Sequence, residues 1–252
     1  MRDDPEKQAF YYRLGEEYFW LSGHYDSAWF VLKPYLENRA RKDSGKLRIL
    51  DAGCGPGNFI SKIKSSGVVF GIDYSKEALK FCLTKHQIPT FISNLERLAV
   101  RDESFDCVAS LEVLEHVTHD EAALREFFRI LKPGGLGIIS VPAFQMLWGP
   151  HDEWFGHLRR YTKKELAGKL DAAGFSVIRC HYFKCFFFLP MLVLRKIKNW
   201  FGLYEDVKTD YISIPNWLNR FFRWLMVHEV KWKIADQLPF GTHLLCLFRK
   251  PE

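Results

Sequence analysis

Alternating glycines follow the first short apolar run of the chain, and this spacing is typical of a ligand-binding turn. Residues 48–51 predict a β-strand, and a helix-like pattern begins after the last of the three glycines, Gly53, Gly55 and Gly57. A residue without a side chain is needed in such a turn because a Cβ would keep a flat ligand away from the backbone. The turn therefore predicts a place where backbone, rather than side chains, contacts a ligand.

An acidic residue ends the next apolar run. Asp73 lies 22 residues after Asp51, at the predicted tip of a second strand. A carboxylate there is placed to accept hydrogen bonds from the hydroxyl groups of a ribose. The turn and the carboxylate together predict a nucleoside-binding crevice. Asn58 stands where a dinucleotide fingerprint has its third glycine, which counts against a nicotinamide cofactor.

A second set of reactive side chains follows the fourth and fifth predicted strands. Glu112, Glu115 and His116 stand at positions i, i+3 and i+4, so they share one face if this stretch is helical. Residues 148–162 follow the fifth strand and contain His157. Because ligands bind at the carboxyl ends of parallel strands, this stretch should reach the same rim of the sheet as the crevice.

Two arginines and a tyrosine close this stretch. Arg159, Arg160 and Tyr161 precede a predicted helix, and arginine side chains match the geometry of phosphate and carboxylate groups. They could therefore bind an anionic group of a substrate. The equally weighted alternative is that one of these arginines pairs with Asp152 or Glu153 and only orders the loop.

The pattern from Lys46 onward alternates strands and helices, which is typical of an α/β fold with a doubly wound, Rossmann-like sheet. Six strands are predicted at residues 48–51, 68–73, 90–93, 105–110, 136–141 and 175–182, and a seventh, 242–248, returns antiparallel beside the sixth. Helices are predicted at residues 57–65, 76–86, 120–131 and 163–173. The sequence therefore predicts a seven-stranded core made of residues 46–183 and 242–252.

Two aromatic-rich segments flank this core. Residues 1–45 predict one or two helices, interrupted at Pro34, that form either a lid over the crevice or a layer over the sheet edge. Residues 184–241 are far longer than a hairpin needs, so they predict a helical insertion between the last two strands. Within this insertion, residues 217–226 have the pattern of an amphipathic helix.

The insertion carries most of the positive charge of the chain. Nine Lys or Arg residues stand against four acids between Lys184 and Lys233, while the whole chain has a formal net charge of +6. Basic and aromatic residues together predict a cap for an apolar substrate, a membrane-surface element or a dimer interface. Because the first residues are polar and no apolar run reaches the length of a membrane span, we predict a cytoplasmic protein with, at most, peripheral membrane contact.

The motifs resemble those of class I S-adenosylmethionine-dependent methyltransferases, and among them the ubiquinone-biosynthesis O-methyltransferases and the type 11 and 12 groups. Four segments carry the resemblance: Asp51–Gly57, Gly71–Ser75, Ser104–Val117 and Leu131–Gly135. The resemblance implies S-adenosylmethionine as cofactor. The residues that would contact it are Asp51, Gly53, Gly55, Gly57, Asp73, Tyr74, Asn94, Leu95 and Leu111.

The resemblance also implies how the chemistry would be done. Methyl transfer to a hydroxyl needs a base or a metal, and His116 or His157 is the expected base. In the ubiquinone-biosynthesis enzymes a similar Glu-x-x-Glu-His string is associated with a divalent metal. The corresponding ligands would be Glu112, Glu115, His116 and His157. Similar strings occur in family members without a metal, where they cap a helix beside the cofactor.

We therefore predict O-methylation of a small acceptor that is apolar, aromatic or lipid-linked. RNA methylation is the first alternative, because the insertion is basic, although no RNA-binding module precedes the core. A protein that binds S-adenosylmethionine without catalysis is the second alternative.

Overall fold

The computed structural model describes residues 17–42, 45–201 and 214–252, with the side chains of residues 198–201 left aside. In these residues seven strands form one sheet in the order β3-β2-β1-β4-β5-β7-β6. The strands are β1 (Arg48–Ala52), β2 (Val68–Asp73), β3 (Thr90–Ile92), β4 (Phe105–Leu111), β5 (Leu131–Pro142), β6 (Ser176–Phe183) and β7 (His243–Arg249). Strands β1 to β5 pair in parallel, and β7 is antiparallel to both β5 and β6. The predicted Rossmann-like α/β fold is confirmed.

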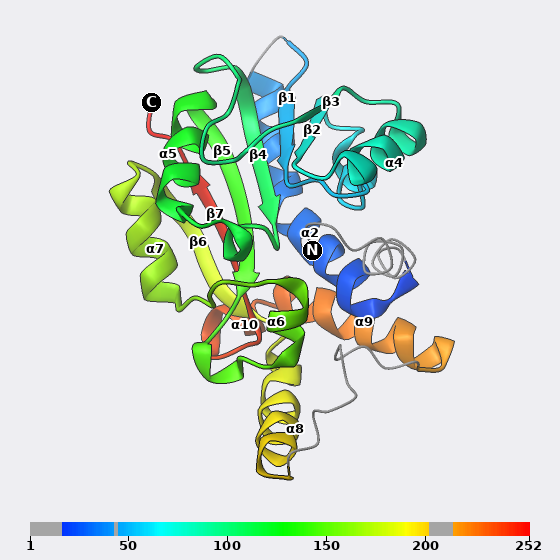
Figure 1. Cartoon of the computed structure of the whole chain (residues 1–252). Helices are drawn as coiled ribbons and strands as arrows, with labels where there is room; N and C mark the ends of the chain where they lie inside the picture. Colours follow the sequence, from blue (N-terminus) through cyan, green and yellow to red (C-terminus); the bar gives the residue numbers. More distant parts are fainter. Residues whose placement is uncertain (1–16, 43–44, 202–213) are drawn as a thin grey trace.

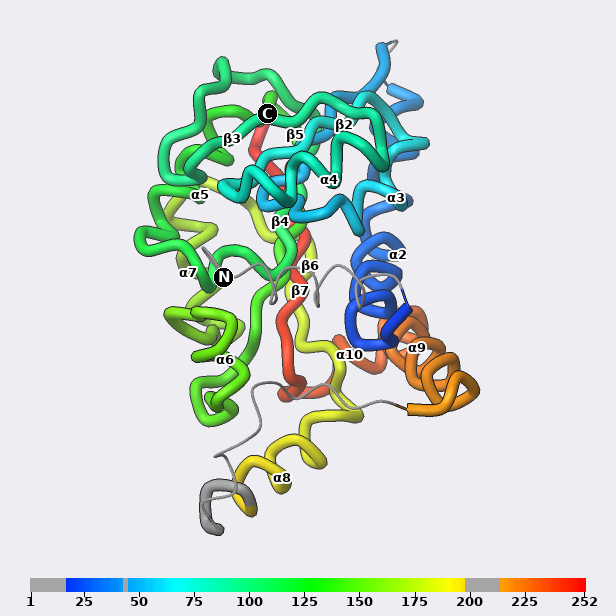
Figure 2. The backbone as a smooth tube through the Cα atoms, turned by 45° about the vertical axis from the view of Figure 1, so that its right-hand side comes forward, coloured from blue at the N-terminus to red at the C-terminus, as the bar shows by residue number. Residues whose placement is uncertain are grey.

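Helices cover both faces of the sheet. Figure 2 shows α2 and α3 on one side and α5 and α7 on the other. The α-helices are α2 (Phe19–Lys42), α3 (Ile60–Ile63), α4 (Lys76–His86), α5 (Asp120–Ile130), α6 (Pro150–Phe155), α7 (Lys163–Ala172), α8 (Phe188–Phe201), α9 (Asn216–Lys231) and α10 (Ile234–Gln237). Short 3-10 turns lie at Leu114–His116, Gln145–Leu147 and Cys185–Phe187. None of the helices in the described residues combines the length and apolarity needed to cross a membrane.

The apolar strands form the core and fix where their ends meet. All seven residues of β4 are buried, as expected for a central strand covered on both faces. Asp51 is in register with Gly71 of β2 and with Ala109 of β4. The loops that leave β1, β2 and β4 therefore begin side by side at one edge of the sheet.

Three predicted elements differ in extent. The helix after the glycine turn spans only Ile60–Ile63. It begins later than predicted because the backbone at Gly57 is left-handed, and the residues between Gly57 and Ile60 form turns. Strand β5 begins at Leu131, and its register with β4 shifts before Leu136 is reached. Helix α2 runs through Pro34 without interruption, since the buried Leu32 and Leu36 hold its inner face against the core.

The N-terminal helix α2 packs against helix α9 of the insertion. Ser27 of α2 donates a hydrogen bond to the carbonyl of Met226 in α9, and Arg223 pairs with Asp26 at 2.6 Å. A Cβ on Gly23 would lie 3.1 Å from the Met226 sulfur, so glycine permits this close approach. Figure 1 places α8 and α9 at the same end of the molecule, beyond the lower ends of β6 and β7. The division of the chain into lid, core and insertion stays a prediction.

Candidate active site

A cavity of about 980 Å³ opens where β1, β2 and β4 end. Seven of the residues predicted to contact a cofactor line it: Gly53, Gly55, Asp73, Tyr74, Asn94, Leu95 and Leu111. They come from four segments that the sheet brings together. The cavity therefore lies where the sequence predicts the crevice.

The glycine turn is shaped to leave room inside this cavity. Gly53 has φ +84°, and a Cβ there would collide with the side chain of Val113. Gly55 has φ +51° and faces open space, where a flat ligand could approach its backbone. The Gly55 N–H donates to Asp73 Oδ2 at 2.9 Å, and the Ser75 N–H donates to Asp73 Oδ1 at 2.8 Å. Because each carboxylate oxygen can accept more than one hydrogen bond, Asp73 is oriented and still able to accept from ribose hydroxyls. The turn and the carboxylate thus fit the nucleoside part of S-adenosylmethionine.

Two predicted cofactor residues lie outside the cavity wall. Asp51 is buried, and burial together with the nearby Asp73 raises its pKa to about 8. Gly57 packs behind the turn, where a Cβ would lie 2.5 Å from the His86 ring. These two residues support the turn from behind rather than facing the cavity.

Tyr25 also lines the cofactor cavity, and sequence reasoning did not identify it. It belongs to α2, so the N-terminal helix does contribute to the wall of the crevice. Only its position in an aromatic-rich, helix-forming segment pointed to it. Val113 is a second unpredicted wall residue, and it packs directly against Gly53.

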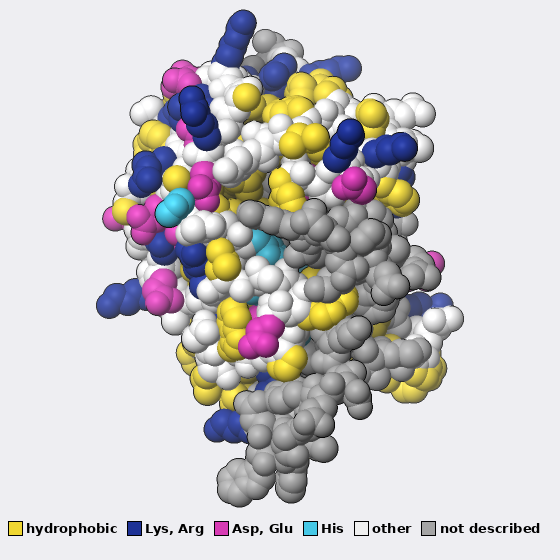
Figure 3. Space-filling view, viewed as in Figure 1, with side chains coloured by type: hydrophobic (Ala, Val, Ile, Leu, Met, Phe, Trp, Pro, Cys, Tyr) yellow, Lys and Arg dark blue, Asp and Glu magenta, His cyan; other side chains and the backbone are white. Residues whose placement is uncertain are grey.

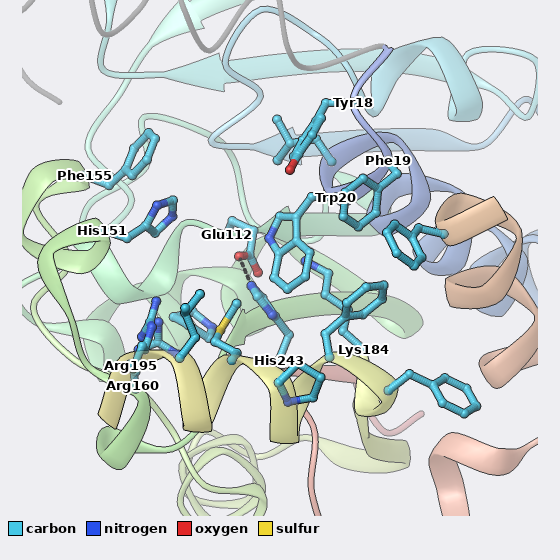
Figure 4. A pocket seen from close by; sticks show the side chains of 18 of the residues that line it. Tyr18, Phe19, Trp20, Glu112, His151, Phe155, Arg160, Lys184, Arg195 and His243 are labelled. Atoms are coloured by element: carbon cyan, nitrogen blue, oxygen red, sulfur yellow. Dashed lines mark ion pairs between the residues drawn. The ribbon is translucent and has the colours of Figure 1, made fainter. Parts of the chain in front are cut away.

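A second cavity, of about 420 Å³, adjoins the first. Glu112 and His116 line both cavities, so they form the boundary between them. Figure 4 shows aromatic side chains of the N-terminal segment, Tyr18, Phe19 and Trp20, on one side and His151 and Phe155 on another. Apolar side chains of α8 and α9, including Met191, Leu194, Phe222 and Leu225, form a further part of the wall. An apolar molecule of modest size would fit this second cavity.

Glu112 is held at the boundary by an unusual backbone and a histidine. Its φ of +58° is rare for a residue with a side chain, and such conformations are often retained at functional sites. His243 Nε2 lies 2.9 Å from Glu112 Oε2, the ion pair drawn in Figure 4. Burial alone would raise the pKa of Glu112, but the electrostatic interactions with His243, His24 and Lys184 outweigh it and hold this pKa well below its usual range. Burial in turn lowers the pKa of His243 to about 4, so its contact with Glu112 is a hydrogen bond from a neutral ring near neutral pH. Glu112 is therefore a carboxylate, and its Oε1 has no hydrogen-bond partner among the described residues.

Lys184 is a buried amine in the wall of the second cavity. Its side chain has no exposed surface, and its Nζ finds no hydrogen-bond partner in the described part of the chain. Trp20 covers this nitrogen, with the ring centroid 4.2 Å away. Burial lowers the pKa of Lys184 to about 7. Neither Lys184 nor His243 was predicted, because they come from β6–α8 and β7, where the sequence offers only aromatic and basic composition as a signal.

The structure separates the four predicted metal ligands. Glu115, His116 and His157 each offer a ligand atom within 4.8 Å of the others, whereas Glu112 belongs to a second group with His24 and His243. Burial, followed by the charge of Glu112, raises the pKa of Glu115 well above its usual value. A neutral carboxyl is a poor cation ligand, so only an ion strong enough to displace its proton would fit this group. A divalent metal therefore stays a prediction, with three of its four expected ligands together.

The two predicted catalytic histidines lie against each other. The His116 and His157 rings are 4.8 Å apart, and both line the second cavity. His157 Nδ1 lies 2.8 Å from Asp152 Oδ1, which fixes the ring and leaves Nε2 available. Burial lowers the pKa of His116 to about 3, so His116 is neutral at physiological pH. Their role as a general base stays a prediction.

Arg159, Arg160 and Tyr161 are held by carboxylates of the protein itself. Arg160 Nε and Nη2 lie 2.8 and 3.0 Å from the Asp152 oxygens. Arg159 pairs with Asp120 at 3.2 Å, and the Tyr161 hydroxyl donates to the same residue at 2.7 Å. The pair of Arg160 with Asp152 corresponds to the alternative that the sequence left open, in which one arginine orders the loop. Only Arg160 among the three lines the second cavity, and a substrate role for the trio stays a prediction.

Comparison with known proteins relates this site to a family. Residues 50–139 match the methyltransferase domain family. A probable S-adenosylmethionine-dependent methyltransferase of Mycolicibacterium smegmatis is 28% identical over 168 residues, which are 65% of this chain and 62% of that protein. A ubiquinone biosynthesis O-methyltransferase of Xanthomonas oryzae is 36% identical over 40% of this chain and 45% of its own length.

A third relative and a solved structure extend the comparison. The tRNA (carboxymethyluridine(34)-5-O)-methyltransferase of Arabidopsis thaliana is 30% identical over 56% of this chain and 34% of its own length. The chain therefore spans less than two thirds of the length of each of these relatives. An S-adenosylmethionine-dependent methyltransferase of Thermotoga maritima shares the fold, with a TM-score of 0.59, 15% identity, and 97% of this chain and 95% of that chain covered.

Proposed function

We propose that this chain, which belongs to the class I S-adenosylmethionine-dependent methyltransferases, transfers the methyl group of S-adenosylmethionine to an oxygen of a small apolar or aromatic molecule. The family uses S-adenosylmethionine, and the cavity with the glycine turn and Asp73 fits its nucleoside. The acceptor is proposed to occupy the second, mostly apolar cavity. A lipid-like acceptor would be met at a membrane surface, in line with the predicted peripheral contact.

The single observation that carries this proposal is the shared boundary of the two cavities. Glu112 and His116 line both, so a methyl group leaving one cavity enters the other beside these two side chains. Methyl transfer is an in-line displacement, so positioning of the two reactants is the main task of the protein. The acceptor oxygen forms the new C–O bond, the C–S bond breaks with its electron pair on sulfur, and the hydroxyl proton leaves to a base.

Glu112 is the side chain whose position at the boundary best suits it to accept this proton, although its low pKa makes it a weak base. Its carboxylate is held by His243 through Oε2, which leaves Oε1 to accept a proton from the acceptor hydroxyl. Lys184 in the same wall, in its protonated form, would favour a developing negative charge on the acceptor oxygen. Because Trp20 covers the Lys184 nitrogen, the indole must shift for direct contact with an acceptor.

Transfer of labelled methyl groups tests the proposal. The pure protein is incubated with methyl-labelled S-adenosylmethionine and an extract of the source cells, followed by organic–aqueous partition. We expect label in the organic phase. Label in the aqueous phase that nuclease releases would favour an RNA acceptor, and binding of S-adenosylmethionine without any transfer would favour a non-catalytic protein.

A further inference from the structure

An exposed aromatic stripe runs along α9. The stripe consists of Trp217, Phe221, Trp224 and Trp232, spaced so that they share one side of the helix, and Trp217 leaves 66% of its surface exposed. Neighbouring rings support one another: Phe221 and Trp224 are stacked, and His228 bridges Trp224 to Trp232 with centroid distances of 4.3 and 4.9 Å. The opposite side of α9 holds the buried Met226 and Val230.

Helix α8 exposes a second apolar stripe. Leu189, Val193 and Ile197 recur every fourth residue, and Leu189 leaves 60% of its surface exposed. Phe186 and Leu194 are also exposed, and both line the acceptor cavity. The ring of Phe187, which directly precedes α8, contacts the ring of Phe222 in α9 at a centroid distance of 5.3 Å. The two stripes therefore flank the cavity proposed to hold the acceptor.

The exposed charged residues within the two stretches that carry the stripes, residues 185–197 and 214–233, are basic. Lys196, Arg220, Lys231 and Lys233 are exposed. In residues 185–197 and 214–233, Glu229 is the only acidic residue, and it is buried with its oxygens accepting backbone N–H groups of Lys184 and Cys185. Figure 3 shows hydrophobic side chains over the outer end of α9, with basic side chains close by. The surface thus combines apolar contact with positive charge.

We propose that the exposed stripes of α8 and α9 bind an anionic lipid bilayer and place the mouth of the acceptor cavity at its surface. Tryptophan and phenylalanine are favoured at the boundary between headgroups and acyl chains, and each basic residue adds attraction to anionic lipid. A second copy of this chain is disfavoured as occupant because two such surfaces would bring like charges together. This inference builds on the proposed function, since it names where an apolar acceptor would be supplied.

Vesicle flotation of the full chain tests the inference. The probes are vesicles of phosphatidylcholine alone and vesicles containing phosphatidylglycerol. We expect the wild type to float with the anionic vesicles, to be released as salt rises, and to shift its tryptophan fluorescence to shorter wavelength on binding. The triple change Trp217→Ser, Phe221→Ser and Trp224→Ser should weaken this partitioning at least tenfold, and Leu189→Ser with Val193→Ser should also weaken it.

The control replaces apolar residues of similar exposure on α4, Phe81→Ser with Leu83→Ser, and should leave partitioning unchanged. The change Lys231→Glu with Lys233→Glu should reduce binding to anionic vesicles only. A wild type that stays in solution, or a triple variant that floats as well as the wild type, would overturn the inference. Binding to a single-stranded RNA oligonucleotide in place of vesicles would do the same.

S-adenosylmethionine binding, measured by calorimetry on the same samples, separates this inference from the proposed function. Vesicle binding requires neither cofactor nor turnover, and none of the substituted residues lines either cavity. A variant that has lost vesicle binding and kept its cofactor affinity is folded, and its loss is specific to the surface. Transfer to an acceptor dissolved in detergent should then persist.

Discussion

The two cavities that meet at Glu112 are built from different parts of the chain. Apart from Tyr25, Gly156 and Leu158, the cofactor cavity is lined within residues 53–118, by loops that directly follow parallel strands. The second cavity, proposed to hold the acceptor, takes side chains from α2, α6, α8, α9 and β7, from residue 18 to residue 243. One site is thus a local backbone shape, and the other exists only when distant segments have packed.

The comparison teaches which kind of site tolerates change. The glycine turn of the cofactor cavity needs glycine at a few positions and one oriented carboxylate, which together suit a single kind of ligand. A cavity lined by side chains can change its ligand through many single substitutions. We therefore expect variants of the two regions to separate cofactor binding from acceptor turnover.

Glu112→Gln should have the largest effect. It removes the proposed base and keeps the size of the side chain, so methyl transfer should fall about 100-fold, as is typical when a general base is lost. The affinity for S-adenosylmethionine should stay within about threefold of wild type. Initial rates and calorimetry measure the two effects separately.

Glu115→Gln is the matched control for this change. Burial favours the neutral form of Glu115, so a neutral amide should alter turnover little. An equal loss in both variants would indicate that the group of Glu115, His116 and His157, rather than Glu112, governs turnover. It would also bring a metal at that group back into consideration.

Asp73→Ala should weaken S-adenosylmethionine binding tenfold or more. The change removes the carboxylate that is oriented by the backbone of Gly55 and Ser75 and placed for the ribose. Glu77→Ala, on the exposed first turn of α4, serves as control and should leave the affinity unchanged. Calorimetric titration measures both, and an unchanged affinity in Asp73→Ala would refute the assignment of this residue.

Lys184→Met should raise the stability of the fold. The folded chain holds the pKa of Lys184 near 7, against 10.5 ordinarily, because burial disfavours its charge. The unfolded chain therefore binds this proton more tightly, and the wild type gains stability as pH rises from about 7 to 10.5. The variant lacks the free-energy cost of burying this charged amine. Its melting temperature should therefore exceed that of the wild type by about 4 °C near pH 6, and by less at pH 10.

Thermal unfolding across pH measures this difference. Lys33→Met, on the exposed side of α2, removes the same charge without burial and should shift the melting temperature by about 1 °C or less. A Lys184→Met variant that melts below wild type at every pH would show that Glu112 and Glu229 stabilise the buried cation more than burial costs.

The cofactor site was predictable because its signals are local. The glycine spacing and the acidic residue at the end of β2 lie in short segments whose strands pair in a known order, so their meeting point follows from the fold. Tyr25 was missed because no short motif marks which face of α2 turns toward the crevice. Arg160 was ambiguous for the same reason, since only packing decides between Asp152 and a substrate.

The second cavity, proposed to hold the acceptor, was not predictable from local patterns. Lys184 and His243 are single residues in strands and turns without a motif, and they meet Glu112 because β7 lies between β5 and β6. The aromatic residues of α9 had the right helical spacing, but the spacing alone does not tell which side faces the core. Met226 takes the inner side, and Trp217 is left outside.

The position of β7 has a consequence for how the protein is made. This strand enters the sheet between two strands that the ribosome has already released, β5 and β6. Until β7 has entered, β6 has no neighbouring strand to pair with, and the edge of β5 is open to pairing with other chains. His243 arrives with the same strand, so a nascent chain can complete its cofactor crevice early but cannot orient Glu112 until this last strand is in place. Ribosome-bound chains that lack β7 should therefore depend on chaperones and be inactive toward the acceptor.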